Sequence, residues 1–313
     1  MLVGIDIGGT KTHILVAAPN TEDVHIVVPT AEWQRSYLLG DSANAERLVA
    51  LYAAHVGAWT GVPLAVGAHG CDTEAQCEAF RVQLERVHPG PVDVVNDAEL
   101  LGPAAGTQDP VLAVIVGTGS IVVGTTSDGG KVTSGGHGWL LGDPGSAPAL
   151  AREAVRAVLQ ARDEGLDREI LAERFLAHCQ AADETELSYL FASDLRITRW
   201  GSIAPLIFDC AKEGSPLAQA IIESAAATLA ADVARIRRRG AQGSTVVMAG
   251  GVAVNQPLLL EAFKRHVAAG HPELNVKLLT IPPVWGALER AKHLTETSPT
   301  KMKESNEYHQ PVG

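Results

Sequence analysis

Two glycine-rich turns in the sequence have residue types suited to binding phosphate. The first is Asp6-Ile7-Gly8-Gly9-Thr10-Lys11-Thr12, which joins two apolar runs. Its successive backbone N–H groups, two hydroxyls and one ammonium predict a concave anion-binding loop. Asp6 ends a buried run and is placed to hold a hydrated Mg²⁺, which prefers one or two carboxylates plus substrate phosphates. The alternative is a plain surface hairpin, but a buried acid is costly without a task.

The second turn, Gly117-Thr118-Gly119-Ser120, also lies between two apolar runs. It repeats the strand, Gly-Thr turn and strand plan of the N-terminus, which predicts an internal duplication of a hairpin-led α/β unit. Alone it would equally suit a structural turn. Two such turns predict a phosphate chain held from both sides. Neither turn is a Walker A loop or a GxGxxG fingerprint, so the grip would be built on hairpins.

Asn96-Asp97 follows the apolar run 92–95 and precedes a short helix. Asp97 alone would suit a helix N-cap as well as a catalytic base. Between two phosphate-binding turns, a carboxylate at a strand's carboxyl end is what phosphoryl transfer to an alcohol needs, because the base accepts the hydroxyl proton. His69-Gly70-Cys71-Asp72 also ends a strand and is expected to line the same crevice. A metal site from His69, Cys71 and Cys77 is the weaker alternative.

Two further glycine-rich segments are candidates for ligand contact. Residues 135–146 offer a second carboxylate, Asp143, which suits either a sugar hydroxyl or a helix cap. Gly250-Gly251 follows the buried run 244–249 and permits close approach of a flat ligand such as adenine, the alternative being a tight strand-to-helix turn.

The apolar pattern places these turns between strands and helices of an α/β protein. Strands are predicted at residues 3–7, 12–17, 24–28, 64–67, 92–95, 111–116, 121–126, 244–249 and 276–281. Thr73 and Gln76 predict a capping box at a helix start. After Ser146 the pattern becomes helical, with helices predicted at 148–161, 168–177, 184–192, 202–211, 216–239, 257–268 and 285–293. The segment Trp33-Gln34-Arg35 is interpreted either as a lid over the substrate or as a surface loop.

Composition narrows the class of protein. The chain of 313 residues favours two lobes, and its formal charge of −11 argues against a nucleic-acid or anionic-membrane surface. The N-terminus lacks a signal-peptide pattern, and no apolar run is interpreted as a membrane span. The four cysteines lack CxxC spacing and are typical of free thiols. These features predict a cytoplasmic protein.

Taken together, these motifs resemble the N-acetylglucosamine kinase branch of the BadF/BadG/BcrA/BcrD ATPase family, within the actin, hexokinase and heat-shock chaperone superfamily. The resemblance extends to about residue 295 and includes Met248-Ala-Gly-Gly-Val252 and Trp285-Gly-Ala287. It implies an α/β fold of two ribonuclease H-like lobes with an interdomain cleft, the actin-like ATPase fold. The expected lobes are residues 1–106 and 107–294, with a helical insertion in the second, a last helix at 284–294 that packs back on the first lobe, and a disordered tail at 295–313.

The resemblance also implies an ATP-dependent kinase that acts on the 6-hydroxyl of an amino sugar, with N-acetylglucosamine as the first candidate. It implies roles for individual residues as well. Asp97 is the expected base and Asp6 the expected Mg²⁺ ligand. ATP is expected to contact Gly8, Gly9, Thr10, Lys11, Thr12, Thr118, Gly119, Gly250, Gly251 and Asn255. The sugar is expected to contact Gly70, Cys71, Asn96, Asp97, Ser120, Gly136 and Asp143. A homodimer is the expected assembly.

The sequence departs from the family pattern at two positions. His137 stands where the family usually has Trp, and Pro144 where it usually has Glu, which affects the identity of the sugar more than the reaction. Glucosamine, N-acetylmuramic acid and hexoses are the alternative substrates. Two other classes stay open: an ATPase that activates an iron–sulfur reductase or dehydratase, which needs thiolates, and a non-catalytic sugar sensor.

Overall fold

The chain forms two units in the computed structural model, which describes residues 1–56 and 61–296. Unit 1 comprises Met1–Gln108 and the chain from Ile281 onward, and unit 2 comprises Asp109–Thr280. The last helix, α13 (Val284–Glu296), therefore packs with the N-terminal residues. Of the predicted disordered tail at 295–313, Thr295 and Glu296 belong instead to α13, and the rest lies outside the described residues.

Unit 1 is built on a five-stranded sheet of order β3-β2-β1-β4-β5. Its strands are β1 (Leu2–Ile7), β2 (Lys11–Ala17), β3 (Val24–Pro29), β4 (Leu64–Ala68) and β5 (Val92–Val95). The first three strands are antiparallel, and β4 and β5 continue the sheet parallel to β1. Asp6 pairs with His13 on one side and with Gly67 on the other, so it sits in the middle of the sheet near the carboxyl end of β1.

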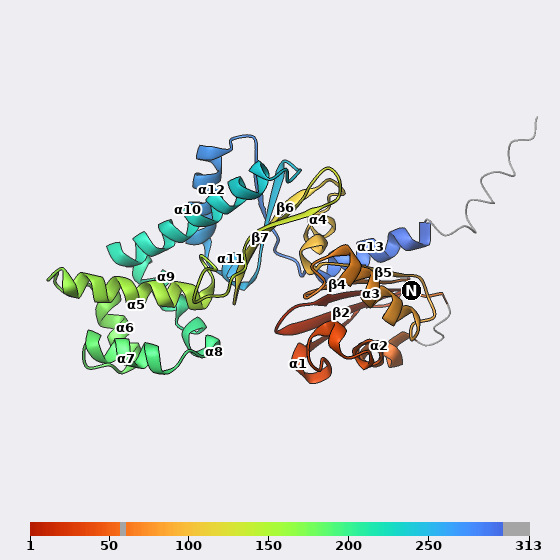
Figure 1. Ribbon diagram of the computed structural model, residues 1–313, viewed down its shortest axis with the longest axis horizontal. Helices are drawn as coiled ribbons and strands as arrows, with labels where there is room; N and C mark the ends of the chain where they lie inside the picture. Colours follow the sequence, from red (N-terminus) through yellow and green to blue (C-terminus); the bar gives the residue numbers. More distant parts are fainter. Residues whose placement is uncertain (57–60, 297–313) are drawn as a thin grey trace, which may run out of the picture. The chain divides into compact units, whose positions relative to one another are not determined.

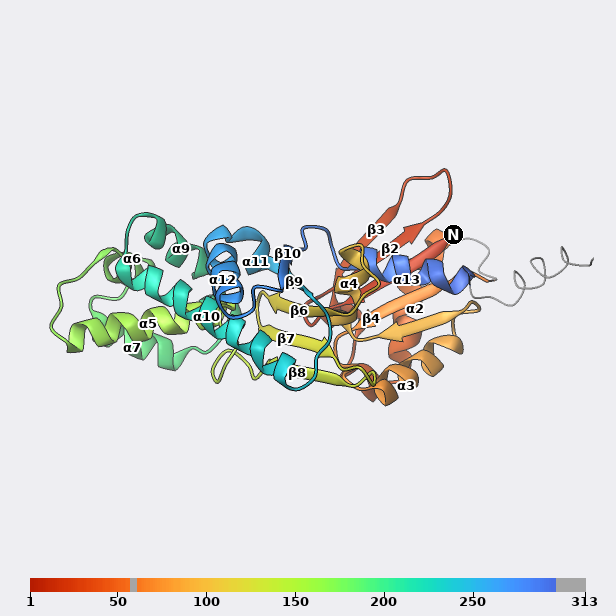
Figure 2. The same ribbon diagram turned by 90° about the horizontal axis from the view of Figure 1, so that it is seen from above.

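Helices cover both faces of this sheet, which agrees with the mostly apolar sequences of β1 and β4, in which Asp6 is the one charged residue. The helical elements are α1 (Thr30–Trp33), η1 (Leu38–Gly40), α2 (Ala43–Val56), α3 (Glu74–Glu85), η2 (Asp97–Leu100), α4 (Leu101–Ala104) and α13. Leu48, Tyr52 and Phe80 from α2 and α3 join the main core, while Leu288 of α13 packs on Leu15 in a smaller one. Figures 1 and 2 show α13 lying along the sheet. A Cβ on Gly4 would come within 2.7 Å of the Leu288 nitrogen, so glycine permits this close packing.

Unit 2 has a second five-stranded sheet, of order β10-β9-β6-β7-β8. Its strands are β6 (Val111–Val116), β7 (Ser120–Thr125), β8 (Lys131–Gly135), β9 (Thr245–Ala249) and β10 (Asn275–Leu278). Its helices are α5 (Ala147–Asp163), α6 (Ile170–Cys179), α7 (Glu184–Ser193), α8 (Ile197–Gly201), α9 (Ala204–Lys212), α10 (Pro216–Arg238), α11 (Gly251–Asn255) and α12 (Pro257–Gly270).

The two sheets share one connection pattern. β1 pairs antiparallel with β2 and parallel with β4, and β6 pairs antiparallel with β7 and parallel with β9. In both sheets the hairpin turn carries a predicted phosphate loop. This agreement is what an internal duplication of a hairpin-led α/β unit requires.

Some elements depart from the sequence-based prediction. β8 was not expected, because Lys-Val-Thr-Ser-Gly has one buried side chain in five and little apolar signal. Helices α1 and α8 were also missed, since each has five residues or fewer. The capping box of α3 is confirmed, with the Thr73 hydroxyl accepting the Gln76 N–H.

The expectation that no apolar run is long enough for a membrane span needs correction. Helix α10 is long and apolar enough to cross a membrane by length and composition alone, with a mean hydropathy of 1.3, and is the one such helix in the described ranges. Its alanines raise the hydropathy. Ala226, Leu229, Val233 and Ile236 are buried in the core of unit 2, so the packing is that of a core helix.

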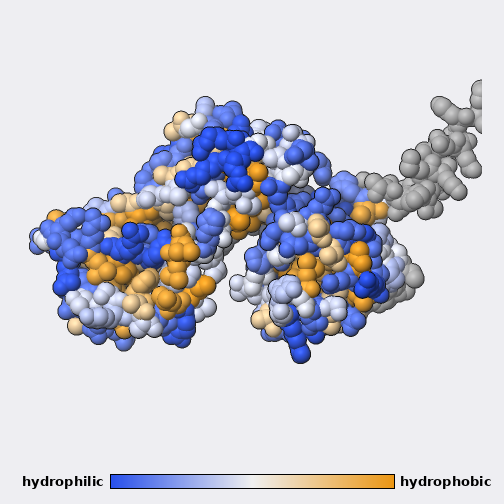
Figure 3. Space-filling model, in the orientation of Figure 1, coloured by the Kyte–Doolittle hydropathy of each residue, from blue (hydrophilic) through white to orange (hydrophobic). Residues whose placement is uncertain are grey.

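Figure 3 shows apolar surface patches on unit 2 mixed with hydrophilic surface. Leu166, Leu195 and Ile197 are exposed apolar residues of this unit, and Leu141 is 87% exposed. Exposed apolar residues of this kind are ordinary on a protein surface, so they do not indicate an oligomer interface.

Candidate functional site

The turn between β1 and β2 forms an open loop in unit 1. The Gly8 N–H donates to the Lys11 carbonyl at 2.9 Å, which closes a tight turn. Gly9, Thr10 and Lys11 are exposed at its tip. Their backbone and side chains are accessible to a ligand, as the anion-binding prediction needs.

Thr12 does not lie at the open side of this loop. It is fully buried, and its hydroxyl bonds the Trp33 indole N–H at 2.9 Å and the Thr30 hydroxyl at 3.0 Å. The expectation that Thr12 contacts ATP therefore needs correction, because both bonding directions of its hydroxyl are used inside the protein. Trp33 is likewise buried, so the lid interpretation of residues 33–35 does not hold for the tryptophan.

Asp6 is a partly buried carboxyl at the centre of the sheet. Burial raises its pKa to about 7, the nearby Asp97 carboxylate adds to the rise, and the Lys11 ammonium opposes it. A divalent cation beside two carboxylates would favour their charged forms, and carboxylate oxygens are the ligands that Mg²⁺ prefers. The donor set thus fits Mg²⁺, with Asp6 as the expected ligand. Three or more grouped metal-ligating side chains do not occur among residues 1–56 and 61–296, which leaves the His69, Cys71 and Cys77 alternative without support.

Asp97 is the first residue of η2, directly after β5. The sequence left two roles open for Asp97, helix N-cap and catalytic base. The N-cap of η2 is Asn96, whose side chain accepts the Ala98 N–H. Asp97 Oδ1 also accepts the Ala98 N–H, at 3.0 Å. Its side chain is 24% exposed, so solvent reaches it.

His69 lies beside Asp97. The sequence predicted only that the two residues line the same crevice. Its Nδ1 is 3.8 Å from Asp97 Oδ2, and its side chain is 65% exposed. The same ring lies over the first phosphate loop, because a Cβ on Gly9 would be 3.6 Å from it. The His69 N–H donates to the Ile7 carbonyl at 2.8 Å, which fixes this end of β4 beside β1.

Two of the expected sugar contacts in unit 1 are buried inside the protein. Cys71 has no exposed surface and joins the core, so its side chain is not available to a sugar. Asn96 is 6% exposed, and its amide nitrogen donates to the Cys71 carbonyl at 3.3 Å and to Asp72 Oδ1 at 3.2 Å. The expectation for the Cys71 side chain is corrected, and both residues brace the loop after β4 against η2; an Asn96 contact with the sugar stays a prediction. Gly70, with φ of 88°, has open space around it.

Unit 2 brings the second phosphate loop next to the predicted adenosine glycines. The Gly117 N–H donates to the Gly119 carbonyl at 2.8 Å, and Thr118 and Gly119 are exposed. A Cβ on Gly117 would lie 3.5 Å from the Gly251 nitrogen. Gly250 has φ of 102°, and a Cβ there would come within 2.4 Å of the Val116 carbonyl oxygen. Adjacent parallel strands β6 and β9 explain this meeting of two segments far apart in the sequence.

Asn255 closes α11, and its side-chain amide donates to the Gly251 carbonyl at 2.7 Å. It is exposed, as are Gly251 and the tip of the second loop. The residues expected to contact ATP in unit 2 therefore gather at one edge of this sheet.

The segment from Gly135 to Ser146 is held firmly along its length. The Ser120 hydroxyl donates to the Pro144 carbonyl at 2.8 Å, and the Gly136 N–H donates to the Ser120 carbonyl at 3.0 Å. Ser120 is 4% exposed and braces this segment, and its contact with a sugar stays a prediction. Trp139 packs edge-on against Phe191 of α7, with ring centroids 5.8 Å apart. His137 and Gly136 remain exposed.

Asp143 is a buried carboxylate in this segment, with φ of 54°. Its Oδ1 accepts the Gly138 N–H at 3.1 Å, and its Oδ2 lies 3.1 Å from where a Cβ on Gly119 would be. It therefore links the second phosphate loop to the segment 135–146. Whether it also meets a sugar stays a prediction.

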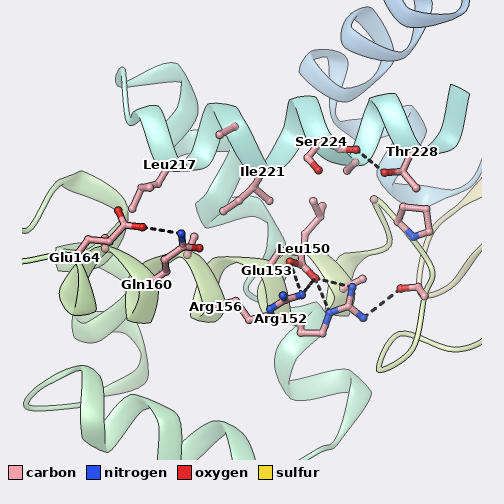
Figure 4. A pocket seen from close by; sticks show the side chains of 18 of the residues that line it. Leu150, Arg152, Glu153, Arg156, Gln160, Glu164, Leu217, Ile221, Ser224 and Thr228 are labelled. Atoms are coloured by element: carbon pink, nitrogen blue, oxygen red, sulfur yellow. Dashed lines mark hydrogen bonds and ion pairs between the residues drawn. The ribbon is translucent and has the colours of Figure 1, made fainter. Parts of the chain in front are cut away.

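A groove of about 540 Å³ runs behind this segment between α5 and α10. Figure 4 shows Arg152, Glu153 and Gln160 on α5 opposite Leu217 and Ile221 on α10. Gly142, Pro144 and Gly145 also line it. Arg152 donates to the Gly142 carbonyl at 3.2 Å. Helix α5 thus supports the back of the segment, a role that no sequence motif indicated.

Residues 3–288 match the BadF/BadG/BcrA/BcrD ATPase family. This chain belongs to that family. The N-acetylmuramic acid/N-acetylglucosamine kinase of Clostridium acetobutylicum is 24% identical over 298 residues, covering 92% of this chain and 96% of the relative. The N-acetyl-D-glucosamine kinase of Dictyostelium discoideum is 28% identical over 201 residues, 61% of this chain and 62% of that protein.

A solved structure extends the likeness to the fold. The Porphyromonas gingivalis protein described as an N-acetylglucosamine kinase matches with a TM-score of 0.66 and 18% identity, covering 95% of this chain and all of the other. With two such sheets and this likeness, the chain has the actin-like ATPase fold that is expected of the BadF/BadG/BcrA/BcrD family.

Proposed function

We propose that this protein is an ATP-dependent sugar kinase that phosphorylates the 6-hydroxyl of an amino sugar, with N-acetylglucosamine as the first candidate. The observation that carries the proposal is the solvent-accessible Asp97 carboxylate at the end of β5, close enough to Asp6 to raise its pKa. The relatives named as N-acetylglucosamine kinases support the choice of sugar.

In unit 1, Asp97 is proposed to accept the proton of the sugar hydroxyl. The hydroxyl oxygen then bonds to the γ-phosphorus, and the bond from that phosphorus to the bridging oxygen breaks, so that ADP leaves with the electron pair. The exposed N–H groups and side chains of Gly9, Thr10 and Lys11 are proposed to hold phosphate oxygens. Gly70 leaves open space for the substrate.

In unit 2, the exposed Thr118-Gly119 turn is proposed to bind phosphate, and Gly250, Gly251 and Asn255 to approach the adenosine. Gly136 and Asp143 are proposed to select the sugar. The positions at which the sequence departs from the family, His137 and Pro144, lie in this same segment, and His137 is exposed.

Mg²⁺ is proposed to bind at Asp6 and to neutralise negative charge on the phosphates. The Asp6 carboxyl must be ionised for this role. Its pKa of about 7 makes that ionisation sensitive to the surroundings. A cytoplasmic location and a homodimer remain predictions of the sequence.

The test is an ATP-coupled assay with glucosamine, N-acetylglucosamine, N-acetylmuramic acid and glucose. We expect ADP release to be stimulated most by N-acetylglucosamine, with a phosphorylated sugar detected by mass spectrometry. The 6-deoxy analogue of N-acetylglucosamine is the matched control, because it keeps the other groups of the sugar and lacks the hydroxyl that accepts the phosphoryl group. ADP formation with no dependence on any sugar would contradict the proposal and favour the other two classes.

The alternative of an iron–sulfur activator rests on thiolates. Cys71 and Cys210 are fully buried, and burial raises the pKa of the Cys210 thiol. Anaerobic purification with a charge-transfer absorption band would favour that class. A non-catalytic sensor would bind ATP and sugar without turnover and would have no use for Asp97.

A further inference from the structure

A chain of buried hydrogen bonds ends on the first phosphate loop. The Thr30 hydroxyl donates to the Gly8 carbonyl at 2.8 Å. The Thr12 and Thr30 hydroxyls are 3.0 Å apart, and the Trp33 indole N–H donates to the Thr12 hydroxyl at 2.9 Å. Thr12 lies on β2, whereas Thr30 and Trp33 lie on α1, about twenty residues further along the sequence. Gly8 lies in the turn between β1 and β2.

The direction of every bond in this chain follows from counting hydrogens. A threonine hydroxyl has one hydrogen to donate. Thr30 uses its hydrogen on the Gly8 carbonyl, so it must accept from Thr12. Thr12 then donates to Thr30 and accepts from the indole, which can only donate. The order is therefore Trp33 N–H, Thr12 O–H, Thr30 O–H and Gly8 carbonyl, with each hydrogen used.

Burial keeps water from replacing these bonds. Thr12, Trp33 and Thr30 are 0%, 3% and 5% exposed. In such surroundings a polar network is stable only if each member is satisfied. Removing one hydroxyl leaves its neighbours unpaired, so the effect should reach the loop.

This chain of hydrogen bonds also sets the direction in which the backbone N–H groups of the first phosphate loop point. In a planar trans peptide the carbonyl and the following N–H point in opposite directions. Because the Gly8 carbonyl points toward Thr30, the Gly9 N–H points away from it. The Thr30 N–H holds the Thr10 carbonyl at 3.0 Å in the same way, which turns the Lys11 N–H outward.

We propose that Trp33, acting through Thr12 and Thr30, is a positioning residue for nucleotide phosphate binding. This inference rests on the proposed function only in taking the loop as a phosphate site. The chain orients the loop amides before the nucleotide arrives, which lowers the cost of ordering them on binding. Trp33 itself is buried and touches no nucleotide.

The test compares two substitutions at one position. Thr30→Val removes the hydroxyl and keeps the shape, whereas Thr30→Ser keeps the hydroxyl. We measure ADP affinity by calorimetry without sugar, KM for ATP and for sugar, and thermal midpoint. Thr30→Val should weaken ADP binding and raise KM for ATP about tenfold, with KM for sugar within twofold. Thr30→Ser should bind ADP within about twofold of the unmodified protein.

Two further variants keep the test decisive. Trp33→Phe removes the first donor together with part of a buried ring, and should shift ADP affinity in the same direction by about threefold, even if Thr30→Val fails to fold. Thr21→Val, which removes an exposed hydroxyl in the β2–β3 turn, should change nothing. Equal ADP affinity in the Val and Ser variants, or no ADP binding by the unmodified protein, would overturn the inference. Retained ADP effects without sugar phosphorylation would contradict only the kinase function.

Discussion

At the scale of single residues, the chemistry depends on carboxylates whose surroundings differ. Asp6 is held near the centre of a sheet with a raised pKa, while Asp97 is accessible at the end of β5. The sequence identified both, because strand ends and residue types are visible in it. It did not reveal that Thr12, Cys71, Asn96 and Ser120 have their side chains engaged or buried, since their partners lie up to 25 residues away.

Ser120 gives a prediction at this scale. Ser120→Ala removes the hydrogen bond to the Pro144 carbonyl and leaves that oxygen without this donor, which should cost about 1 kcal/mol of stability. The loosened segment 135–146 should raise KM for sugar several-fold, with KM for ATP little changed. Steady-state kinetics and denaturant unfolding measure both effects. Ser202→Ala, which removes an exposed hydroxyl in the same unit, is the control; equal changes in the two variants would refute the role.

At the scale of elements, the ends of neighbouring strands bring distant loops together. The strands around the phosphate loops were predicted, because apolar runs bounded by glycine are strong signals. Strand β8 and the short helices α1 and α8 were missed, since their placement depends on tertiary partners such as Trp33 with Thr12. The close approach of Gly250 to β6 is likewise a tertiary fact, although the glycine pair hinted at it.

Two adjacent glycines test that approach. Gly250→Ala places a Cβ within 2.4 Å of the Val116 oxygen at a left-handed φ, so we expect a loss of at least several kcal/mol in stability or nucleotide affinity. Gly251→Ala meets no atom within 4 Å and should be close to neutral for stability. Thermal unfolding and ADP calorimetry compare them. A tolerated Gly250→Ala would mean that β6 and α11 are not packed as described.

At the scale of the whole molecule, each unit has its own sheet and core, and helix α13 ties the C-terminal chain to unit 1. The duplicated plan was predictable because both copies keep the strand, Gly-Thr turn and strand order. The order of strands within each sheet was not predictable from the apolar pattern, since it depends on which strand edges hydrogen-bond to each other.

The stability of unit 1 should depend on pH through His13, a buried histidine that contacts the exposed His25. Burial lowers the pKa of His13, and His25, whose Nδ1 is 3.0 Å from His13 Nε2, lowers it further. Below pH 6.5 the unfolded chain binds a proton at His13 more readily than the folded chain does. The free energy of unfolding therefore falls as the pH drops below 6.5. His13→Gln should reduce this slope in thermal unfolding between pH 7 and 5. An unchanged slope would show that other groups, such as the buried His88, account for it.

If Asp97 accepts the proton of a sugar hydroxyl during transfer from ATP, Asp97→Asn should lose most of its sugar-dependent ADP formation, which a steady-state assay measures. The amide keeps the size of the side chain but is a far weaker base. We predict a fall in kcat of about 100- to 10,000-fold, with ADP affinity by calorimetry within about threefold of the unmodified protein. Near-normal kcat with N-acetylglucosamine would show that Asp97 is not the base.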